Sequence, residues 1–141
     1  MNEHGFVRSV HRKLSSDVFV WKINDKFAGG VPDAFYAGAA RYLFIEYKYI
    51  KLPKRSSTPI KTGLSAQQKL WLNKMLGMDK QVAVIIGSCS GSLILRQDWD
   101  RPIPAELFRQ RAMSTEAVAQ WITAYCLDKN HDHEEGFFRG C

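Results

Sequence analysis

GGVPDAFYAGAARYLFIEYKYI, residues 29–50, is the stretch that decides the fold of this 141-residue chain. It opens with two glycines and a proline, which mark a turn, and Asp33 ends that turn. From residue 43 onward, side chains alternate with the period of two that predicts a β-strand. Glu46 and Lys48 then project from the same face of the strand, about 6–7 Å apart. If Asp33 reaches the same place from a neighbouring strand, two carboxylates and one ammonium group meet, and carboxylates are the oxygen ligands that Mg²⁺ prefers.

The sequence around this strand predicts an α/β fold. We expect helices over residues 3–15, 65–76, 104–111 and 115–127, and strands over residues 18–23, 32–37, 42–50, 81–87 and 92–96. The fourth strand is continuously apolar, as expected of a strand covered on both faces. Pro53 and Pro59 exclude a regular helix from residues 51–63, which we expect to form a basic loop. The order α-β-β-β-α-β predicts an antiparallel meander whose helix crosses over to a further strand.

Length and composition are those of one soluble globular domain. At 141 residues the chain is long enough for a substantial core, and 45% of it is hydrophobic. We expect a core over residues 1–97, a helical extension of the same domain over 98–128 and a polar, mobile tail over 129–141. Three cysteines without metal-binding spacing indicate a reducing environment. With no apolar run of membrane-spanning length and no signal-peptide pattern, we expect a cytoplasmic protein without membrane contact.

The positive charge of the chain is concentrated in one segment. Residues 41–80 contain nine Lys or Arg and two acidic residues, a net charge of +7, whereas the rest contains eleven basic and twelve acidic residues. A localised basic region is typical of a protein that binds a polyanion. The alternative is a solvated charged face. The position of this segment directly after Glu46 and Lys48 favours binding, and the residues we expect to hold phosphates are Lys51, Lys54, Arg55, Lys61 and Lys69.

The same residues carry a family resemblance. Gly30-Val31-Pro32-Asp33 followed by Ile45-Glu46-Tyr47-Lys48 resembles the motif of the PD-(D/E)xK nucleases, and within them the VRR-NUC and Holliday-junction-resolvase-like group. The strand before the glycine turn and the Ser65-initiated helix after the basic loop follow in the family's order. The resemblance covers roughly residues 3–88. It implies an αβββαβ core with a mixed sheet, to which this chain adds C-terminal helices.

The resemblance also implies a set of site residues. Asp33, Glu46 and the backbone carbonyl of Tyr47 are expected to bind Mg²⁺ or Mn²⁺, with no small-molecule cofactor. Lys48 is expected to act on the attacking water and on the transition-state charge. Glu3, on the first helix, matches an acidic position of the family as a further ligand or water-positioning group. Gln68 matches the family's glutamine on the helix after the strand.

Each of these residues has a simpler explanation as well. Asp33 is a residue type common in turns, and an acid such as Glu3 is favoured at a helix N-terminus by the helix dipole. Glu46 and Lys48 are compatible with the solvent face of an edge strand, although their apolar neighbours argue against a fully wet face. Gln68 forms a capping box with Ser65, which is sufficient to account for it.

Three further features have a simpler reading too. Lys22, near the glycine turn, is compatible with a phosphate contact, but an ordinary surface lysine is the favoured interpretation. The cluster His131-Asp132-His133-Glu134-Glu135 lies in the polar tail and is interpreted as disordered or as an adventitious metal binder without a function. Trp71 and Trp121 have helical spacing typical of packing residues.

The sequence therefore predicts a metal-dependent endonuclease. No base-reading motif is recognised, so we expect it to select the structure of DNA, and the resemblance implies branched substrates such as junctions, flaps or forks. Homodimers are common among resolvase-like proteins, because symmetric cleavage of a junction requires two sites. Two alternatives stay open: a non-catalytic nucleic-acid-binding module on the same fold, and a nuclease that acts on RNA.

Overall fold

The structure is a computed structural model and describes residues 1–25 and 27–129. The acidic and histidine cluster at residues 131–135, and nearly all of the predicted tail, lie outside the described residues. In chain order the elements are α1 (Glu3–Arg12), β1 (Phe19–Lys22), β2 (Ala34–Ala37), β3 (Tyr42–Tyr49), α2 (Ala66–Gly77), β4 (Val82–Ser88), β5 (Gly91–Leu95), α3 (Ala105–Arg111) and α4 (Thr115–Leu127). Among the described residues, no helix is both long and apolar enough to cross a membrane.

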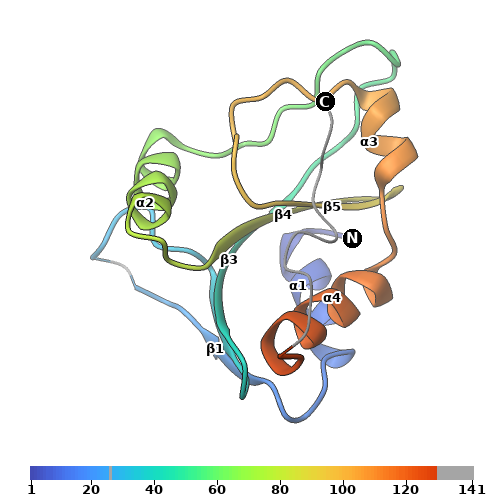
Figure 1. The fold of residues 1–141 in the computed structure, drawn as a ribbon. Helices are drawn as coiled ribbons and strands as arrows, with labels where there is room; N and C mark the ends of the chain where they lie inside the picture. The colour runs from blue at the N-terminus through green and yellow to red at the C-terminus, as the bar shows by residue number, and fades with distance from the viewer. Residues whose placement is uncertain (26, 130–141) are drawn as a thin grey trace.

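The five strands form one mixed sheet in the order β1-β2-β3-β4-β5 (Figure 1). β1, β2 and β3 form an antiparallel meander. α2 then crosses over so that β4 pairs parallel with β3, and β5 returns antiparallel to β4. The predicted α/β class and the αβββαβ core are therefore confirmed, with β5, α3 and α4 as additions after the core.

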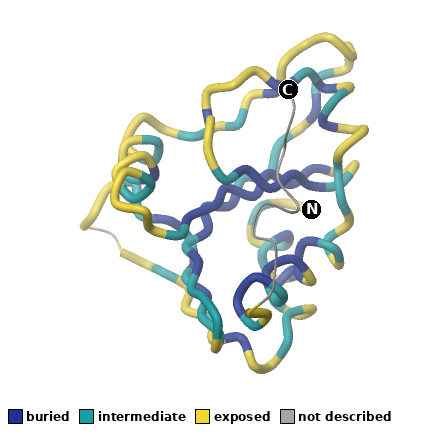
Figure 2. The backbone as a smooth tube through the Cα atoms, in the orientation of Figure 1, coloured by how far each residue is buried: buried dark blue, intermediate teal, exposed yellow. Residues whose placement is uncertain are grey.

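Helices and loops cover the two faces of the sheet unequally. One face, here called the closed face, packs against α1 and α4 through side chains such as Phe6, Val10, Ile45 and Ile122. The other face, here called the open face, is covered over β4 and β5 by α2, α3 and the loop of residues 51–63. Figure 2 shows the consequence: the central strands are buried, whereas β1, at the edge of the sheet, is largely exposed. The core is thus two layers of side chains on either side of β3 and β4.

Two predicted helix ends differ from the structure. α1 ends at Arg12 and not at residue 15, because Lys13 caps it and the chain turns before Val18 packs into the core. α2 includes Gly77, which was predicted to end it. The left-handed residue beyond the helix is Asp79, with a φ of 57°, a conformation that Asp tolerates better than most residues.

The C-terminal helices hold the meander and the basic loop in place. At the C-terminal end of α4, the carbonyl of Cys126 accepts the backbone N–H groups of Ala40 and Arg41 in the β2–β3 hairpin. α3 begins where the N–H of Ala105 donates to the carbonyl of Thr58 in the basic loop. The segment after β5 therefore acts as a brace for two loops of the core.

Candidate functional site

Asp33 sits where β2 separates from β3. The last residue pair of the β2–β3 ladder is Ala34 with Ile45, so continuing the register places Asp33 opposite Glu46. At that point the side chain takes over from the backbone ladder, because Oδ2 of Asp33 accepts the N–H of Tyr47 at 2.8 Å. The N–H and C=O of a residue in an extended strand point to the same side. The carbonyl of Tyr47 therefore faces the side on which Asp33 lies.

Glu46 is the most unusual residue of the sheet. It is 3% exposed, although it lies on the open face. Its Oε2 accepts a hydrogen bond from Nε2 of Gln68 at 3.1 Å and lies 3.6 Å from Nζ of Lys48. Its Oε1 is buried and has no hydrogen-bond partner among the described residues. An unsatisfied buried carboxylate oxygen is costly, so Oε1 of Glu46 is a candidate contact for a bound group.

Burial sets the protonation of Glu46. Loss of hydration, followed by the negative charge and the close side chain of Asp33, raises the pKa of Glu46, Lys48 opposes these effects, and the resulting pKa is about 8. The carboxylate therefore lacks enough positive charge around it to remain ionised near neutral pH. A divalent cation between Asp33 and Glu46 would supply that charge.

The donor set fits such a cation. Two carboxylates and one backbone carbonyl are hard oxygen ligands, and Mg²⁺ binds through one or two carboxylates while keeping several waters. Within residues 1–25 and 27–129, no group of three or more His, Cys, Asp and Glu side chains is placed to hold a metal ion. The residues that could hold a cation here are the two carboxylates, Asp33 and Glu46, together with the Tyr47 carbonyl.

Glu3 lies close enough to this site to interact electrostatically with its charged residues. It is half-buried at the start of α1, and burial, followed by the charge of Asp33, raises its pKa, while Lys48 lowers it. Its charge also contributes to the raised pKa of Glu46. The structure brings Glu3 into the same electrostatic environment, but not into a compact cluster with the other two acids.

Gln68 forms the predicted capping box and also contacts Glu46, while a role in orienting water or Lys48 stays a prediction. Its Oε1 accepts the N–H of Ser65 and its N–H donates to Oγ of Ser65, which completes the capping box. Its Nε2 remains available to donate to Glu46. The sequence-based alternatives were therefore not exclusive: the cap holds the amide in one orientation and its NH₂ group faces the site.

A glycine turn brings α2 to the site. Gly30 has a φ of 82°, and a Cβ atom on Gly29 would lie 2.6 Å from the side chain of Gln67. A larger residue at either position would strain the turn or push α2 away. The two glycines thus allow the segment before Asp33 to pack on the first turn of α2, next to Gln68.

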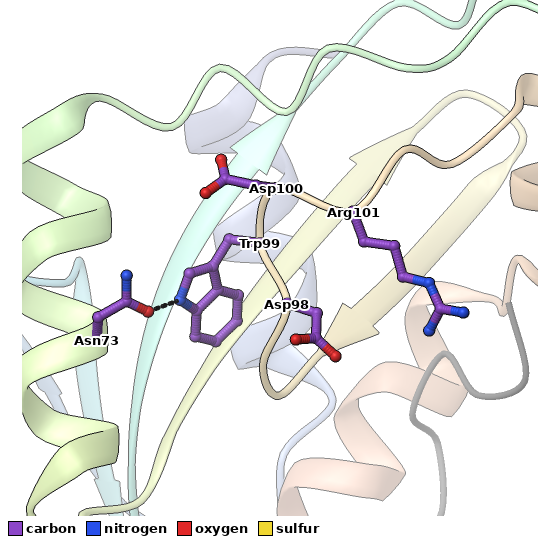
Figure 3. Close-up of a pocket in the computed structure, with 5 residues that line it drawn as sticks. All are labelled: Asn73, Asp98, Trp99, Asp100 and Arg101. Atoms are coloured by element: carbon purple, nitrogen blue, oxygen red, sulfur yellow. Dashed lines mark hydrogen bonds between the residues drawn. The ribbon is translucent and has the colours of Figure 1, made fainter.

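The predicted phosphate-binding residues differ in exposure and in pairing. Lys22, Lys51, Lys54, Arg55 and Lys61 are exposed. Lys69, in contrast, forms an ion pair with Asp100. Asp100 belongs to a cavity of about 550 Å³, in which Asn73 accepts the indole N–H of Trp99 at 2.8 Å (Figure 3). Lys69 is therefore partly neutralised, and the exposed bases are the better candidates for phosphate contacts.

The basic loop is held in place along its length. Leu52 and Ile60 are buried in the core of the open face. The N–H of Ile60 donates to the carbonyl of Ile103 at 2.8 Å, and the guanidinium of Arg109 donates to the carbonyl of Pro53 at 2.9 Å. Its exposed bases are thus presented from a fixed backbone.

Sequence reasoning missed a buried polar chain beneath the site. On the closed face, Nε2 of His11 lies 2.6 Å from the hydroxyl of Tyr36, which lies 2.6 Å from the hydroxyl of Tyr47. Burial lowers the pKa of His11 and raises the pKa of both tyrosines. The alternation of residues 43–50 places Tyr47 inward, but only the register of β2 with β3 brings Tyr36 to it.

Trp71 and Trp121 have the packing roles predicted for them. Trp121 is buried on α4 and stacks against Tyr125, with ring centroids 5.2 Å apart. Trp71 packs against Phe44 with centroids 5.5 Å apart.

Comparisons with known proteins found similarity to a solved structure but no matching family. No protein-family model matches the chain, and no curated protein matches it. Among solved structures, the chain is similar to Hjc, a Holliday junction resolvase from the archaeal hyperthermophile Archaeoglobus fulgidus. The two are 16% identical, the match covers 83% of this chain and 99% of that one, and the TM-score is 0.49. A likeness of this extent does not tell what this chain binds, and membership of the VRR-NUC group remains a prediction.

Proposed function

We propose that this protein is a metal-dependent nuclease that hydrolyses phosphodiester bonds in DNA. The observation that carries the proposal is the state of Glu46. It is a buried carboxylate with one unpaired oxygen, next to Asp33 and within 3.6 Å of a lysine ammonium. A module that only binds phosphates would gain nothing from two acids at this place, because they repel the ligand.

Each residue has a definite task in this proposal. Asp33, Glu46 and the Tyr47 carbonyl would hold Mg²⁺ or Mn²⁺, which supplies a reactive water near neutral pH and neutralises phosphate charge. Lys48 offsets the negative charge that develops on the phosphate and orients the attacking water. Gln68 keeps the Glu46 carboxylate in one orientation by donating to Oε2. Glu3 adds negative charge at the edge of the site and is suited to orienting water.

The exposed bases define how the substrate is held. Lys51, Lys54, Arg55 and Lys61 follow Lys48 in a fixed loop, so the phosphates on one side of the cleaved bond would lie along that loop. Phosphate contacts set the position of a nucleic acid and carry no base information. Selection of DNA structure, as at a junction, flap or fork, is therefore the specificity we propose. A homodimer with two such sites is compatible with a symmetric junction.

The test is a cleavage assay over a panel of labelled junction, flap, fork, single-stranded and linear DNA substrates, with a matched RNA set. We expect cleavage with Mg²⁺ or Mn²⁺, none with a chelator, and binding with little turnover in Ca²⁺, which prefers looser coordination. Full activity in excess chelator would remove the mechanism. Tight binding without cleavage under every metal would favour the non-catalytic module, and cleavage of RNA alone would favour the RNA-directed alternative.

A further inference from the structure

A row of aromatic side chains crosses the open face beside the proposed metal site. Trp21 on β1 pairs with Phe35 on β2, and Phe35 pairs with Phe44 on β3. The ring centroids of Trp21 and Phe35 are 6.2 Å apart, and those of Phe35 and Phe44 are 4.9 Å apart. Phe19 extends the row along β1, because its ring lies 6.5 Å from that of Phe35. These four residues are called the aromatic row below.

Part of the aromatic row faces solvent. Trp21 is 53% exposed and Phe19 is 61% exposed. The helices of the open face pack over β4 and β5, and α1 and α4 pack on the closed face, so within the described residues no helix covers β1 on the open face (Figures 1 and 2). Aromatic side chains that share an exposed face usually mark a binding surface.

The aromatic row is continuous with the metal site. Phe44 precedes Glu46 by two residues on β3, so the two side chains share a face and lie about 6–7 Å apart. A cavity of about 640 Å³ lies at the same place, with Trp21, Lys22, Asn24, Phe27, Val31 and Phe44 in its lining. Val31 belongs to the turn that leads to Asp33. Any chain held across Glu46 therefore has the aromatic row on one side.

On the other side of Glu46 from the aromatic row, the surface is basic. Along β3 the open face presents Phe44, then Glu46 and Lys48, and the chain continues into the exposed bases Lys51 and Lys54 of the basic loop. Lys22 follows Trp21 on β1, so its side chain projects from the opposite face, toward His11. Asp25, which also lines the cavity, directs its carboxylate to the backbone N–H groups of Phe27 and Ala28.

We propose that the aromatic row stacks the unpaired bases of a single strand on one side of the cleaved phosphate, while the basic loop holds duplex phosphates on the other. This inference rests on the proposed nuclease function and narrows its substrate to nucleic acid with a single-stranded segment next to a duplex. Bases match the surface because every base has a flat π-face, so stacking is strong without selecting a sequence. A base-paired duplex keeps its faces stacked inside and cannot use the row.

The experiment compares Trp21→Ala, Trp21→Phe and, as a control, Met78→Ala, which removes an exposed apolar side chain next to α2. Each is titrated in a chelator, so that nothing is cleaved, with a labelled single-stranded oligonucleotide, a blunt duplex and a forked duplex. We expect Trp21→Ala to weaken binding of the single strand and of the fork by roughly 5- to 150-fold, and of the blunt duplex by about twofold or less. Trp21→Phe keeps a ring and should stay close to wild type.

A second readout follows the indole directly. Trp99 and Trp121 are buried, whereas Trp71 is half-buried against Phe44 of the row, so two indoles can report a bound strand. The part of the quenching that belongs to Trp21 is the part lost in Trp21→Phe, and we expect that loss to be large. Equal weakening of single strand and duplex in Trp21→Ala, or unchanged binding of both, would overturn the inference. So would dissociation of a dimer in sedimentation with unchanged oligonucleotide binding, since the row would then belong to a second copy of the chain.

The inference and the proposed function can fail separately. Selective loss of single-strand binding in Trp21→Ala, together with no cleavage of any substrate under any metal, would support base stacking on the aromatic row and refute the nuclease activity. Cleavage that depends on metal, together with no selective loss in Trp21→Ala, would support the nuclease and refute the row.

Discussion

Neighbouring residues on β3 belong to two different environments. Ile45 and Tyr47 face the closed side, where α1 and α4 complete an apolar core around them. Glu46 and Lys48 face the open side, where burial is similar for Glu46 but the partners are polar and incomplete. The closed face thus satisfies its side chains from within the chain, whereas on the open face Oε1 of Glu46 is buried without a hydrogen-bond partner among the described residues. The first face provides stability, whereas the second face, on which we propose the chemistry, keeps a buried charge at some cost in stability.

The largest expected effect is on cleavage, and it comes from comparing a substitution at a proposed metal ligand on the open face with one at a core residue on the closed face. Asp33→Asn keeps an oxygen that can accept the Tyr47 N–H but loses the negative charge, so cleavage should fall roughly a thousand-fold or more, since a bound metal supplies several kcal/mol and each 1.36 kcal/mol is tenfold. Ile45→Ala should instead cost about 2–5 kcal/mol of unfolding free energy and leave turnover of the folded protein largely intact. Chemical denaturation and single-turnover cleavage of both variants check this. Similar behaviour of the two would mean that the faces are not divided as described.

Glu46→Gln should also stop cleavage, but, unlike Ile45→Ala, it should raise the stability of the metal-free protein at high pH. The pKa of Glu46 is raised to about 8 in the folded protein, above the value of about 4.3 for an unfolded chain. Between these values the folded state binds the extra proton, so the metal-free protein loses stability as the pH rises through that window. Removing the charge should make the variant about 1–3 kcal/mol more stable than wild type at pH 9 in a chelator, and should remove stabilisation by Mg²⁺.

Thermal unfolding at several pH values, with and without Mg²⁺, checks that prediction. Glu106→Gln is the matched control, because Glu106 is an exposed carboxylate on α3 and its loss should change neither the pH dependence nor the response to Mg²⁺. A Glu46→Gln variant that is less stable than wild type at high pH would contradict the description of Glu46 as a buried, under-compensated charge.

A smaller effect should distinguish the two roles of Gln68. Gln68→Ala removes the hydrogen bond to Glu46 and half of the capping box, so turnover should fall about 10- to 100-fold and stability by roughly 1 kcal/mol. Ser65→Ala removes the cap but keeps the glutamine, so it should show a similar loss of stability with much less loss of turnover. Rate and stability measured on both variants check this. Equal turnover in the two would mean that Gln68 acts only as a cap.

The smallest effect on turnover is expected in the basic loop. Neutralising Lys51, Lys54 and Arg55 together should weaken DNA affinity for all sequences and lower the salt dependence, by about 0.9 in the slope of log affinity against log salt for each lost contact. Turnover at saturating substrate should change only slightly, because the metal ligands are untouched. Titrations of wild type and variant at several salt concentrations measure both slopes. Unchanged slopes would place the DNA elsewhere on the surface.

Local patterns were sufficient for the order of the elements and for the candidate residues on β3. Alternation assigned Glu46 and Lys48 to one face of β3, and the Ser65 capping box located the start of α2 within one residue. Proline and glycine positions correctly separated the loop of residues 51–63 from both neighbours. These features depend on periods of two and 3.6 residues and on turn chemistry, which are local. The end of α2 was misjudged because Asp79, and not Gly77, adopts the left-handed conformation.

Sequence alone therefore determined the αβββαβ order, the polar face of β3 and the candidate residues Asp33, Glu46, Lys48 and Gln68. Tertiary structure decided what they do to one another: that Gln68 caps α2 and also donates to Glu46, that Oε1 of Glu46 is left without a partner, and that Lys69 is occupied by Asp100. It also aligned Trp21, Phe35 and Phe44, which are far apart in sequence. The physical reason is that strand register and helix docking are long-range, so they join residues that no local period relates.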